Sequence, residues 1–110
     1  MSPEPPTFDV TELRENTRVR VRVRGDLDRA TADALGDRLR SLRECHDAVL
    51  LDLDELDFID ASGLHVVLCA ARDAANDDWP FTVTRGSTRV RRLFAMLDID
   101  EQLPVEDGAP

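Results

Sequence analysis

A serine stands between an acidic residue and a glycine in the segment Asp60-Ala61-Ser62-Gly63-Leu64, after an apolar run and before a helix-like one. If a helix begins at this serine, its unsatisfied backbone N–H groups and its dipole favour an anion. Ser62 is then either the cap of the helix or an acceptor that an enzyme can modify. Asp60 can cap the helix instead, and Gly63 removes side-chain bulk beside the hydroxyl. This combination predicts a Ser62 that an enzyme can reach.

A serine nucleophile is a separate alternative that the sequence disfavours. Such a nucleophile needs a base and an orienting acid. The chain has two histidines, His46 and His65, and neither stands at a spacing that specifies a triad. The Gly-x-Ser-x-Gly elbow of hydrolases is also missing. We therefore expect no enzyme activity.

Four aspartates near this segment raise the alternative of a divalent metal site: Asp52, Asp54, Asp57 and Asp60. Hard cations need oxygen ligands that converge in space, whereas these residues are spread along a strand and a loop. Cys45 and Cys69 are far apart and have neither CxxC nor HExxH spacing, so we expect two reduced thiols. We expect neither a metal nor a cofactor.

The composition describes one acidic domain. The 110 residues are 42% hydrophobic, which suits a single core without metal or disulfide cross-links. With 14 basic residues, all arginine, against 23 acidic ones, the net charge is -9, and such a surface repels nucleic acid and anionic lipids. Neither a signal peptide nor a run of about 20 apolar residues is present. We predict a cytoplasmic protein that binds neither nucleic acid nor membrane.

The elements that position Ser62 begin with two strands. Residues 17–24 alternate strictly, with three valines on one face and four arginines on the other. Residues 8–13 also alternate, and a short loop at 14–16 joins the two segments into an antiparallel hairpin. We interpret the arginine face as solvated strand surface, because nearby acidic residues and the net charge oppose a nucleic-acid site.

The first helix is predicted over residues 29–42. Its apolar stripe is Ala30, Ala34, Leu35, Leu39 and Leu42. Asp28 or Thr31 can cap this helix. Gly36 in its interior costs about 1 kcal/mol relative to alanine.

The remaining segments complete an α/β pattern. Apolar runs predict strands at residues 48–53 and 79–84, and helical spacing predicts helices from residue 62 and from residues 86–87. The order β-β-α-β-α-β-α gives a single mixed sheet with three or four helices packed against it, including one parallel crossover. Residues 1–7 are expected to be disordered, residues 8–105 to form the single domain, and residues 106–110 to be a flexible tail.

Three segments together carry a family signature. The first is Val49-Leu50-Leu51-Asp52-Leu53 followed by Asp57-Phe58-Ile59-Asp60-Ala61-Ser62-Gly63-Leu64. The second is Gly25-Asp26-Leu27-Asp28 with Ala30-Thr31-Ala32, and the third is Val90-Arg91-Arg92-Leu93-Phe94 with Leu97. Running in order from about Phe8 to Leu103, they resemble the STAS family, the sulfate transporter and anti-sigma factor antagonist domain, of the stand-alone antagonist type.

The resemblance implies a bacterial partner switch. In stand-alone members, the serine in the position of Ser62 is phosphorylated by an anti-sigma factor that is itself a serine kinase. The unphosphorylated domain binds this kinase and thereby releases a sigma factor, and a metal-dependent serine phosphatase resets the phosphorylated form. Asp26 in place of Glu, Ala61 in place of a second hydroxyl residue and Thr88 in place of Pro depart from the pattern. None of these changes removes the acceptor.

The partner surface is expected around Ser62, where short loops meet at one end of the sheet. Its residues are Asp26, Asp28, Asp60, Ala61, Gly63, Leu64 and His65. An acidic rim of this kind is met by Arg or Lys on the kinase and steers association. For Asp28 the alternative is that it merely caps the helix after it. Whether the chain forms a homodimer is left open.

Two rival interpretations concern the domain as a whole. Residues 48–53 look like the central strand of a two-component receiver, where an Asp accepts phosphate. Receivers also need a paired acidic site after their first strand and a late Lys, and this chain has no Lys. The stronger rival is a STAS module that senses a small ligand or serves as a scaffold without being phosphorylated, as other members of the family do.

Overall fold

Five strands and three helices make up the part of the chain that the computed structural model describes, residues 8–99 and 102–106. In chain order they are β1 (Phe8–Glu15), β2 (Arg18–Leu27), α1 (Ala32–Glu44), β3 (Val49–Asp52), β4 (Leu56–Ile59), α2 (Ala61–Asp77), β5 (Phe81–Val83) and α3 (Thr88–Met96). The strands form one sheet in the order β1-β2-β3-β5, and β4 also pairs with β2. The predicted α/β class with a single mixed sheet is confirmed.

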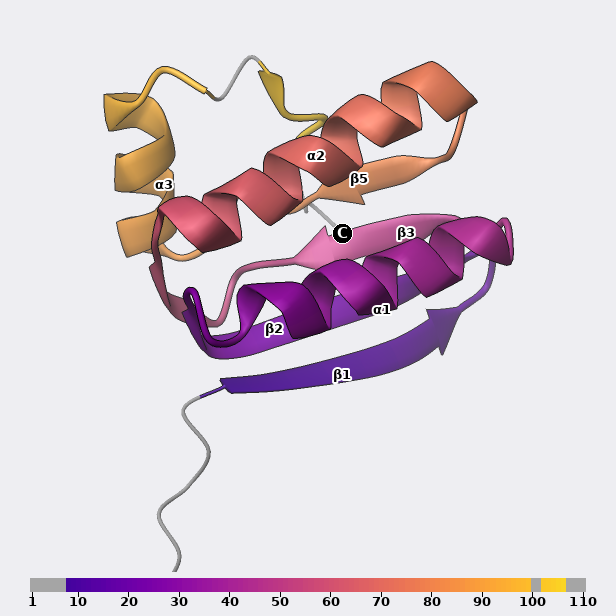
Figure 1. The fold of residues 1–110 in the computed structure, drawn as a ribbon, viewed down its shortest axis with the longest axis horizontal. Coiled ribbons are helices and arrows are strands. Elements are labelled where there is room, and N and C mark those ends of the chain that lie inside the picture. The colour runs from indigo at the N-terminus through magenta and orange to yellow at the C-terminus, as the bar shows by residue number, and fades with distance from the viewer. Residues whose placement is uncertain (1–7, 100–101, 107–110) are drawn as a thin grey trace, which may run out of the picture.

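The two N-terminal strands form the predicted antiparallel hairpin, in register from Phe8 opposite Gly25 to Glu15 opposite Arg18. Strand β3 pairs in parallel with β2, and β5 pairs in parallel with β3. The chain therefore crosses from β3 to β5 through α2, as the order of the elements predicted. The carboxyl ends of the parallel strands face the same edge of the sheet, where α2 and α3 begin (Figure 1).

Strand β4 was not predicted. The expected order places no strand between residues 53 and 62, because a four-residue segment is too short for alternation to be recognised. In the structure β2 has ten residues and β3 only four, so the end of β2 extends beyond β3 and pairs in parallel with β4. The register shifts between Gly25 and Asp26. Gly25 has a φ of 87° there, a conformation that glycine adopts at little cost.

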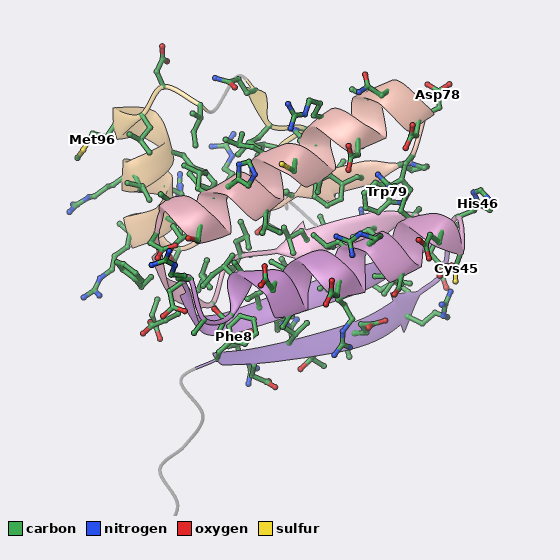
Figure 2. All side chains as sticks on the ribbon, in the orientation of Figure 1. Phe8, Cys45, His46, Asp78, Trp79 and Met96 are labelled. Carbon is green, nitrogen blue, oxygen red and sulfur yellow. The ribbon has the colours of Figure 1, made fainter. Side chains whose placement is uncertain are left out.

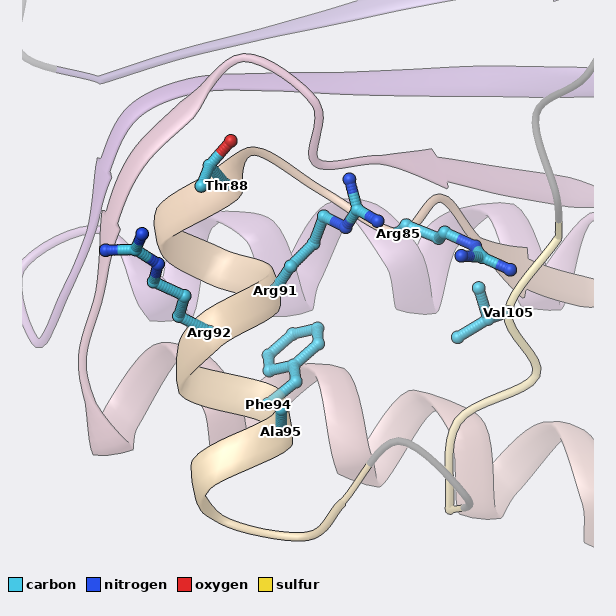
Figure 3. Close-up of a pocket in the computed structure, with 7 residues that line it drawn as sticks. All are labelled: Arg85, Thr88, Arg91, Arg92, Phe94, Ala95 and Val105. Carbon is cyan, nitrogen blue, oxygen red and sulfur yellow. The ribbon is translucent and has the colours of Figure 1, made fainter.

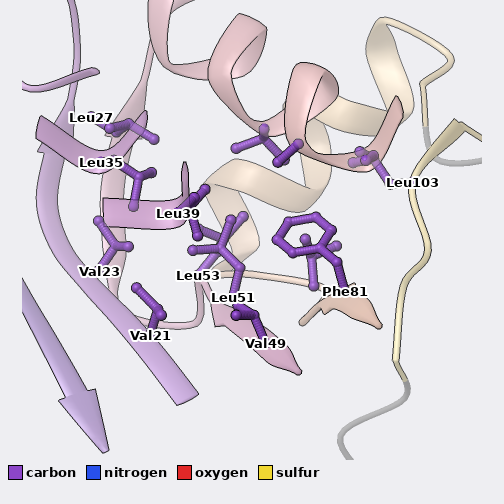
Figure 4. Packing of buried hydrophobic residues seen from close by; sticks show 14 of the residues in the cluster. Val21, Val23, Leu27, Leu35, Leu39, Val49, Leu51, Leu53, Phe81 and Leu103 are labelled. Carbon is purple, nitrogen blue, oxygen red and sulfur yellow. The ribbon is translucent and has the colours of Figure 1, made fainter. Parts of the chain in front are cut away.

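Helices α1 and α2 lie side by side over one face of the sheet, and α3 stands at the end where α2 begins (Figure 1). The three valines of β2 point toward these helices and are at most 2% exposed. They pack with Leu35 and Leu39 of α1, Leu51 of β3 and Val67 of α2 in one hydrophobic core (Figure 4). The period-two pattern of β2 and the helical stripe of α1 thus meet in the core, as predicted.

Turn chemistry decides where α1 starts. The Thr31 hydroxyl donates to the Asp26 carbonyl and accepts from the Asp28 N–H, both at 2.9 Å. The helix therefore begins at Ala32, three residues later than predicted, and Thr31 is its N-cap without a capping bond from its side chain. Two alanines predicted on the buried stripe are exposed, Ala30 and Ala34.

The opposite face of the sheet carries an ion-pair network. Arg20 donates to Asp52 at 2.9 Å and to Glu15 at 2.7 Å, and Asp52 is only 3% exposed. The side chains of Arg18, Arg20 and Arg22 are 24–31% exposed. The arginine face is thus partly exposed to solvent, and acidic residues of β1 and β3 pair with it. Alternation assigns the face but does not reveal the acids that other strands bring to it.

The chain returns to the sheet after α3. Val105 forms a parallel bridge with Val83 of β5. The Glu106 N–H donates to the Val83 carbonyl at 2.8 Å, and its carboxylate accepts from Arg18 at 2.7 Å. The predicted disorder of residues 1–7, and residues 107–110 of the predicted tail, lie outside the described residues.

Trp79 closes the end of the core that is remote from α3. Its indole N–H donates to the Asp47 carbonyl at 2.7 Å, and its ring stacks on Phe81 with centroids 5.0 Å apart. Figure 2 shows Trp79 and His46 at the opposite end of the molecule from Met96 of α3. In the described part of the chain, each helix falls short of the length and apolar character that a membrane span requires.

Candidate functional site

The start of α2 is capped by Asp60. Its backbone is extended, and its carboxylate accepts a hydrogen bond from the Gly63 N–H at 3.0 Å. The Asp60 carbonyl accepts the first helical bond, from Leu64 at 2.9 Å. Of the two candidates that the sequence offered for the cap, the structure selects Asp60. The interpretation of Ser62 as the cap is therefore wrong.

Ser62 lies in the first turn of α2 and is half-buried. Within residues 8–99 and 102–106, its side chain makes none of the hydrogen bonds found. The preceding residue, Ala61, is exposed, and the first turn of α2 holds no acidic side chain. A hydroxyl that is not engaged in the fold, at the positive end of a helix dipole, is chemically suited to accept a phosphoryl group.

Gly63 acts by close packing. It is buried, and a Cβ atom at this position would lie 2.6 Å from both the Leu27 carbonyl oxygen and the Leu27 Cγ, and 3.0 Å from a side-chain carbon of Ile59. A side chain here would push α2 away from the ends of β2 and β4. We predicted that Gly63 clears space beside the serine hydroxyl, but its inward face is the crowded one. Gly63 therefore sets the position of the helix that carries Ser62.

The acidic residues of the predicted partner surface come from two neighbouring turns. The Asp60 N–H donates to the Leu27 carbonyl at 3.1 Å, and Asp26 pairs with Phe58 across β2 and β4. The β2–α1 turn and the β4–α2 turn therefore lie next to each other. This arrangement brings the Asp26 and Asp28 segment to the start of α2, as the sequence predicted.

These aspartates differ in the contacts that their carboxylates make within the fold. The Asp28 carboxylate accepts from the Ala30 N–H at 3.0 Å and lies 3.2 Å from the Thr31 hydroxyl, so it holds the turn before α1. Asp26 is half-buried, and its carboxylate makes no hydrogen bond or ion pair with the described residues. Asp26 is therefore the carboxylate of this rim that is available to a partner.

Leu64 and His65 have separate surroundings. Leu64 is half-buried and packs against the hydrophobic core. His65 is exposed, and its Nε2 lies 3.4 Å from the Cys69 sulfur one turn along α2. Cys69 and Cys45 are both free thiols, as predicted. The His65 ring thus faces Cys69, and no base is hydrogen-bonded to the Ser62 hydroxyl among the described residues.

Sequence reasoning missed Phe58 as a surface residue. It is 50% exposed, whereas its neighbour Ile59 and the strand's first residue, Leu56, are buried. Phe58 precedes the capping Asp60 by two residues, so it presents an apolar ring beside the start of α2. Strand alternation would place Phe58 on the same side as the buried Leu56, whereas in β4 both Asp57 and Phe58 are exposed. The sequence therefore holds no local signal for the exposure of Phe58.

Three of the four aspartates of the alternative metal site have other partners. Asp52 pairs with Arg20, Asp54 accepts from the Gly86 N–H at 3.2 Å, and Asp60 caps α2. Among residues 8–99 and 102–106 the structure contains no group of three His, Cys, Asp or Glu side chains that could hold a metal ion. The carboxylates of these three aspartates thus serve folding contacts.

The fold and the site define a small α/β domain that presents a serine at the start of an aspartate-capped helix. Residues 10–105 match the family model described as "Mlab, STAS domain". The match covers most of the chain, and the chain belongs to the STAS domain family.

Solved structures with this fold include anti-sigma factor antagonists. One from Mycobacterium paratuberculosis has a TM-score of 0.77 and 23% identity, over 93% of this chain and 87% of that one. The antagonist SpoIIAA in its unphosphorylated form has a TM-score of 0.68 and 17% identity, over 93% and 89%. Phosphorylated SpoIIAA, described as a Bacillus cell fate determinant, has a TM-score of 0.67 and 16% identity, over 92% of both chains. At these identities the likeness establishes the shared fold.

Proposed function

We propose that this protein is an anti-sigma factor antagonist whose affinity for its partner is controlled by phosphorylation of Ser62. The observation that carries the proposal is the arrangement at the start of α2. Asp60 caps the helix through Gly63, and the Ser62 hydroxyl is left without a hydrogen bond to the described residues. Phosphorylation of this hydroxyl therefore breaks no hydrogen bond among residues 8–99 and 102–106.

The structural neighbours support this role. SpoIIAA, an antagonist by name, has been solved in unphosphorylated and in phosphorylated form, and both forms match this chain with nearly the same TM-score, 0.68 and 0.67. A phosphoryl group is thus compatible with this fold. The protein then acts by binding and not by catalysis, and it performs its role in the cytoplasm.

The charge of a phosphate is sufficient to release a partner. Phosphorylation adds about -1.5 to -2 charge at pH 7, beside Asp60 and on a chain whose net charge is -9. The α2 dipole returns only about 0.3 to 1 kcal/mol. Burying an unpaired phosphate in an interface costs several kcal/mol, and about 2.7 kcal/mol already lowers affinity a hundredfold. One modification can therefore eject the partner while the domain stays folded.

The partner in this proposal is an anti-sigma factor with serine kinase activity, and its docking surface surrounds Ser62. Phe58 supplies an exposed aromatic side chain, and aromatic residues at interface centres often dominate binding energy. Ala61 and His65 are exposed on the first turns of α2, and Asp26 adds a free carboxylate. Basic residues of the kinase complement this rim and accelerate association. A metal-dependent serine phosphatase returns the domain to its binding form.

A second candidate follows from the family model itself. Its description is "Mlab, STAS domain" and does not contain the word antagonist. A STAS module that binds a partner or a small ligand without being phosphorylated has the same fold. In that case Ser62 is an ordinary surface residue of α2.

The decisive experiment is incubation of the chain with candidate anti-sigma kinases and ATP, followed by intact mass measurement and site mapping. The proposal expects one phosphate, on Ser62, and none on Ser62→Ala. Thr31 and Ser87 serve as internal controls, because both hydroxyls are engaged in turns or caps. Phosphate on Thr31, Ser87 or Thr88 with Ser62 unmodified would contradict the assignment.

Binding measurements distinguish the two candidate functions. Unphosphorylated protein and Ser62→Ala should both capture the kinase, and the phosphorylated form should bind at least about a hundredfold more weakly. Phe58→Ser should lose binding while its melting temperature stays near that of the wild type. A kinase complex that forms equally well with phosphorylated protein favours the module that is not switched.

A further inference from the structure

The charged residues are distributed unevenly along this acidic chain. Residues 79–97 contain four arginines and no Asp or Glu, although the whole chain carries a net charge of -9. Three of these arginines, Arg89, Arg91 and Arg92, lie on α3, and Arg85 precedes the helix. A basic segment on an acidic protein attracts anions at one place on its surface.

The arginines of α3 differ in their partners from those of the sheet and of α1. Those on the sheet and on α1 pair with acids, as Arg20 does with Asp52 and Arg38 with Glu12. Arg89, Arg91 and Arg92 form no ion pair with any residue in the ranges 8–99 and 102–106. Their guanidinium groups therefore offer hydrogen-bond donors that the described fold does not use.

The helix dipole adds to this positive field. The first turn of α3 holds no acidic residue, and its N-cap is the neutral Ser87. Cations near a helix N-terminus are unfavourable, because the dipole places positive partial charge there. An anion bound near Arg91 would relieve this repulsion.

A cavity of about 570 Å³ opens beside this charge, between α3 and the segment that returns to β5. Its lining residues are Arg85, Thr88, Arg91, Arg92, Phe94, Ala95 and Val105 (Figure 3). In Figure 3 the Arg91 side chain extends toward Arg85, and the Phe94 ring points into the space between α3 and Val105. Phe94 is only 1% exposed, so the apolar floor that a ligand can reach consists of Ala95 and Val105.

We propose that this cavity binds a small organic anion, with its phosphate or carboxylate group on Arg91 and its apolar body against Ala95 and Val105. Arginine is suited to this role because its planar fork binds both oxygens of such a group. The volume lies in the range typical of small-molecule sites, and the combination of an apolar floor with a few polar groups is also typical of them. The site is separate from Ser62, and the proposal does not depend on phosphorylation.

Phenyl phosphate is a suitable probe, because it joins one phosphate to one aromatic ring. Its dissociation constant is measured by NMR titration of the isotopically labelled full chain, alongside inorganic phosphate and benzyl alcohol. We expect phenyl phosphate to bind at least about tenfold more tightly than either comparison compound, since only phenyl phosphate contacts both parts of the site. The shifted amides should map to α3 and to residues 103–106.

Two variants test the site itself. Arg91→Gln should weaken binding about tenfold, the loss of one charge-assisted contact. Arg89→Gln is the matched control, because it removes the same charge from the same exposed helix but does not line the cavity. Ala95→Leu should abolish binding by filling the cavity, while the melting temperature shows that the exposed leucine leaves the fold intact.

Several outcomes would overturn the proposal. Equal losses in Arg91→Gln and Arg89→Gln would mean that only the general field of α3 attracts the probe. Equal affinity for inorganic phosphate would mean that the apolar floor contributes nothing. Absence of millimolar binding by phenyl phosphate would remove the small-molecule site, and saturable binding of an acidic peptide in its place would identify the patch as a protein-docking surface.

Discussion

The Asp60 carboxylate accepts the Gly63 N–H at 3.0 Å, and Ser62 lies between these two residues without a hydrogen bond of its own to the described chain. The bond stabilises the helix start with a residue other than the serine. The serine is therefore free to be modified without loss of the cap. Because Asp60 makes this capping contact, a modification of the Ser62 hydroxyl leaves the cap of α2 in place.

Substitutions at Asp60 and Ser62 should have different effects on stability. Asp60→Ala should lower the free energy of unfolding by about 1 kcal/mol, because it removes the cap, whereas Asp60→Asn should retain most of it. Ser62→Ala should change that free energy by less than about 0.5 kcal/mol. Urea unfolding at pH 7 measures all three. A loss in Ser62→Ala as large as in Asp60→Ala would show that the serine shares the capping role.

The two helical glycines should respond to alanine in opposite directions. A Cβ at Gly36 of α1 would meet Val66 at 3.8 Å, which is ordinary contact, so Gly36→Ala should stabilise the protein by about 0.5 to 1 kcal/mol. A Cβ at Gly63 would lie 2.6 Å from the Leu27 carbonyl oxygen, so Gly63→Ala should destabilise it by about 1 to 3 kcal/mol. Thermal unfolding of the pair checks this. Stabilisation by both would contradict the close packing of α2 on β2.

The buried carboxylate of the sheet should be costly to remove. Asp52 is 3% exposed and lies 2.9 Å from Arg20. Asp52→Ala should destabilise the protein by about 1 to 3 kcal/mol, because Arg20 keeps only Glu15 as a partner and the Asp54 N–H loses its acceptor. The control is Asp37→Ala, which breaks the exposed pair with Arg40 and should cost less than about 0.5 kcal/mol. Equal effects in urea unfolding would mean that Asp52 contributes only surface charge.

Glu15 should make stability depend on acid pH. The hydrogen bond from Arg20, and to a smaller extent that from Arg18, lowers the pKa of the Glu15 carboxyl below its ordinary 4.5, although desolvation opposes the shift. Because the pKa is lower in the folded state, the stabilisation is present above about pH 4.5 and is lost as the pH falls through the folded value.

The measurement is the melting temperature of wild type and of Glu15→Gln as the pH is lowered from about 7 to about 3. The gap between the two proteins should be widest at neutral pH and should close on acidification. Glu44→Gln, at an exposed residue, is the control and should show no such trend. A gap that stays constant with pH would contradict the role of the ionised carboxylate.

Asp26 should steer partner association, which rests on the proposed function. Asp26→Asn should slow association with the kinase and flatten its dependence on salt, with little change in melting temperature, because the carboxylate makes no contact with the described residues. Asp78→Asn removes the same charge at the opposite end of α2 and should be neutral. Asp28 is unsuitable for this test, since its carboxylate holds the turn before α1. Stopped-flow mixing measures the association rates. Equal rates for Asp26→Asn and Asp78→Asn would contradict the proposal that the acidic rim steers association.

The sequence by itself determined the hairpin, the buried valines of β2, the helix that begins near Ser62 and the family. These features depend on local periodicity and on short motifs, and both can be recognised in a single amino-acid sequence. The resemblance carried by the Asp60–Leu64 segment and its neighbours also singled out Ser62 as the candidate acceptor. Asp60 was recognised as one of two candidate caps, but local sequence does not rank two competent caps.

Tertiary structure decided what depends on partners from distant segments. β4 exists because β2 extends beyond β3, the arginine face is neutralised because Asp52 reaches it from β3, and Gly63 is crowded by Leu27. The cavity beside Arg91 likewise forms because residues 103–106 return to β5 and face α3. Such contacts join residues tens of positions apart, and their energies depend on geometry that no local pattern encodes.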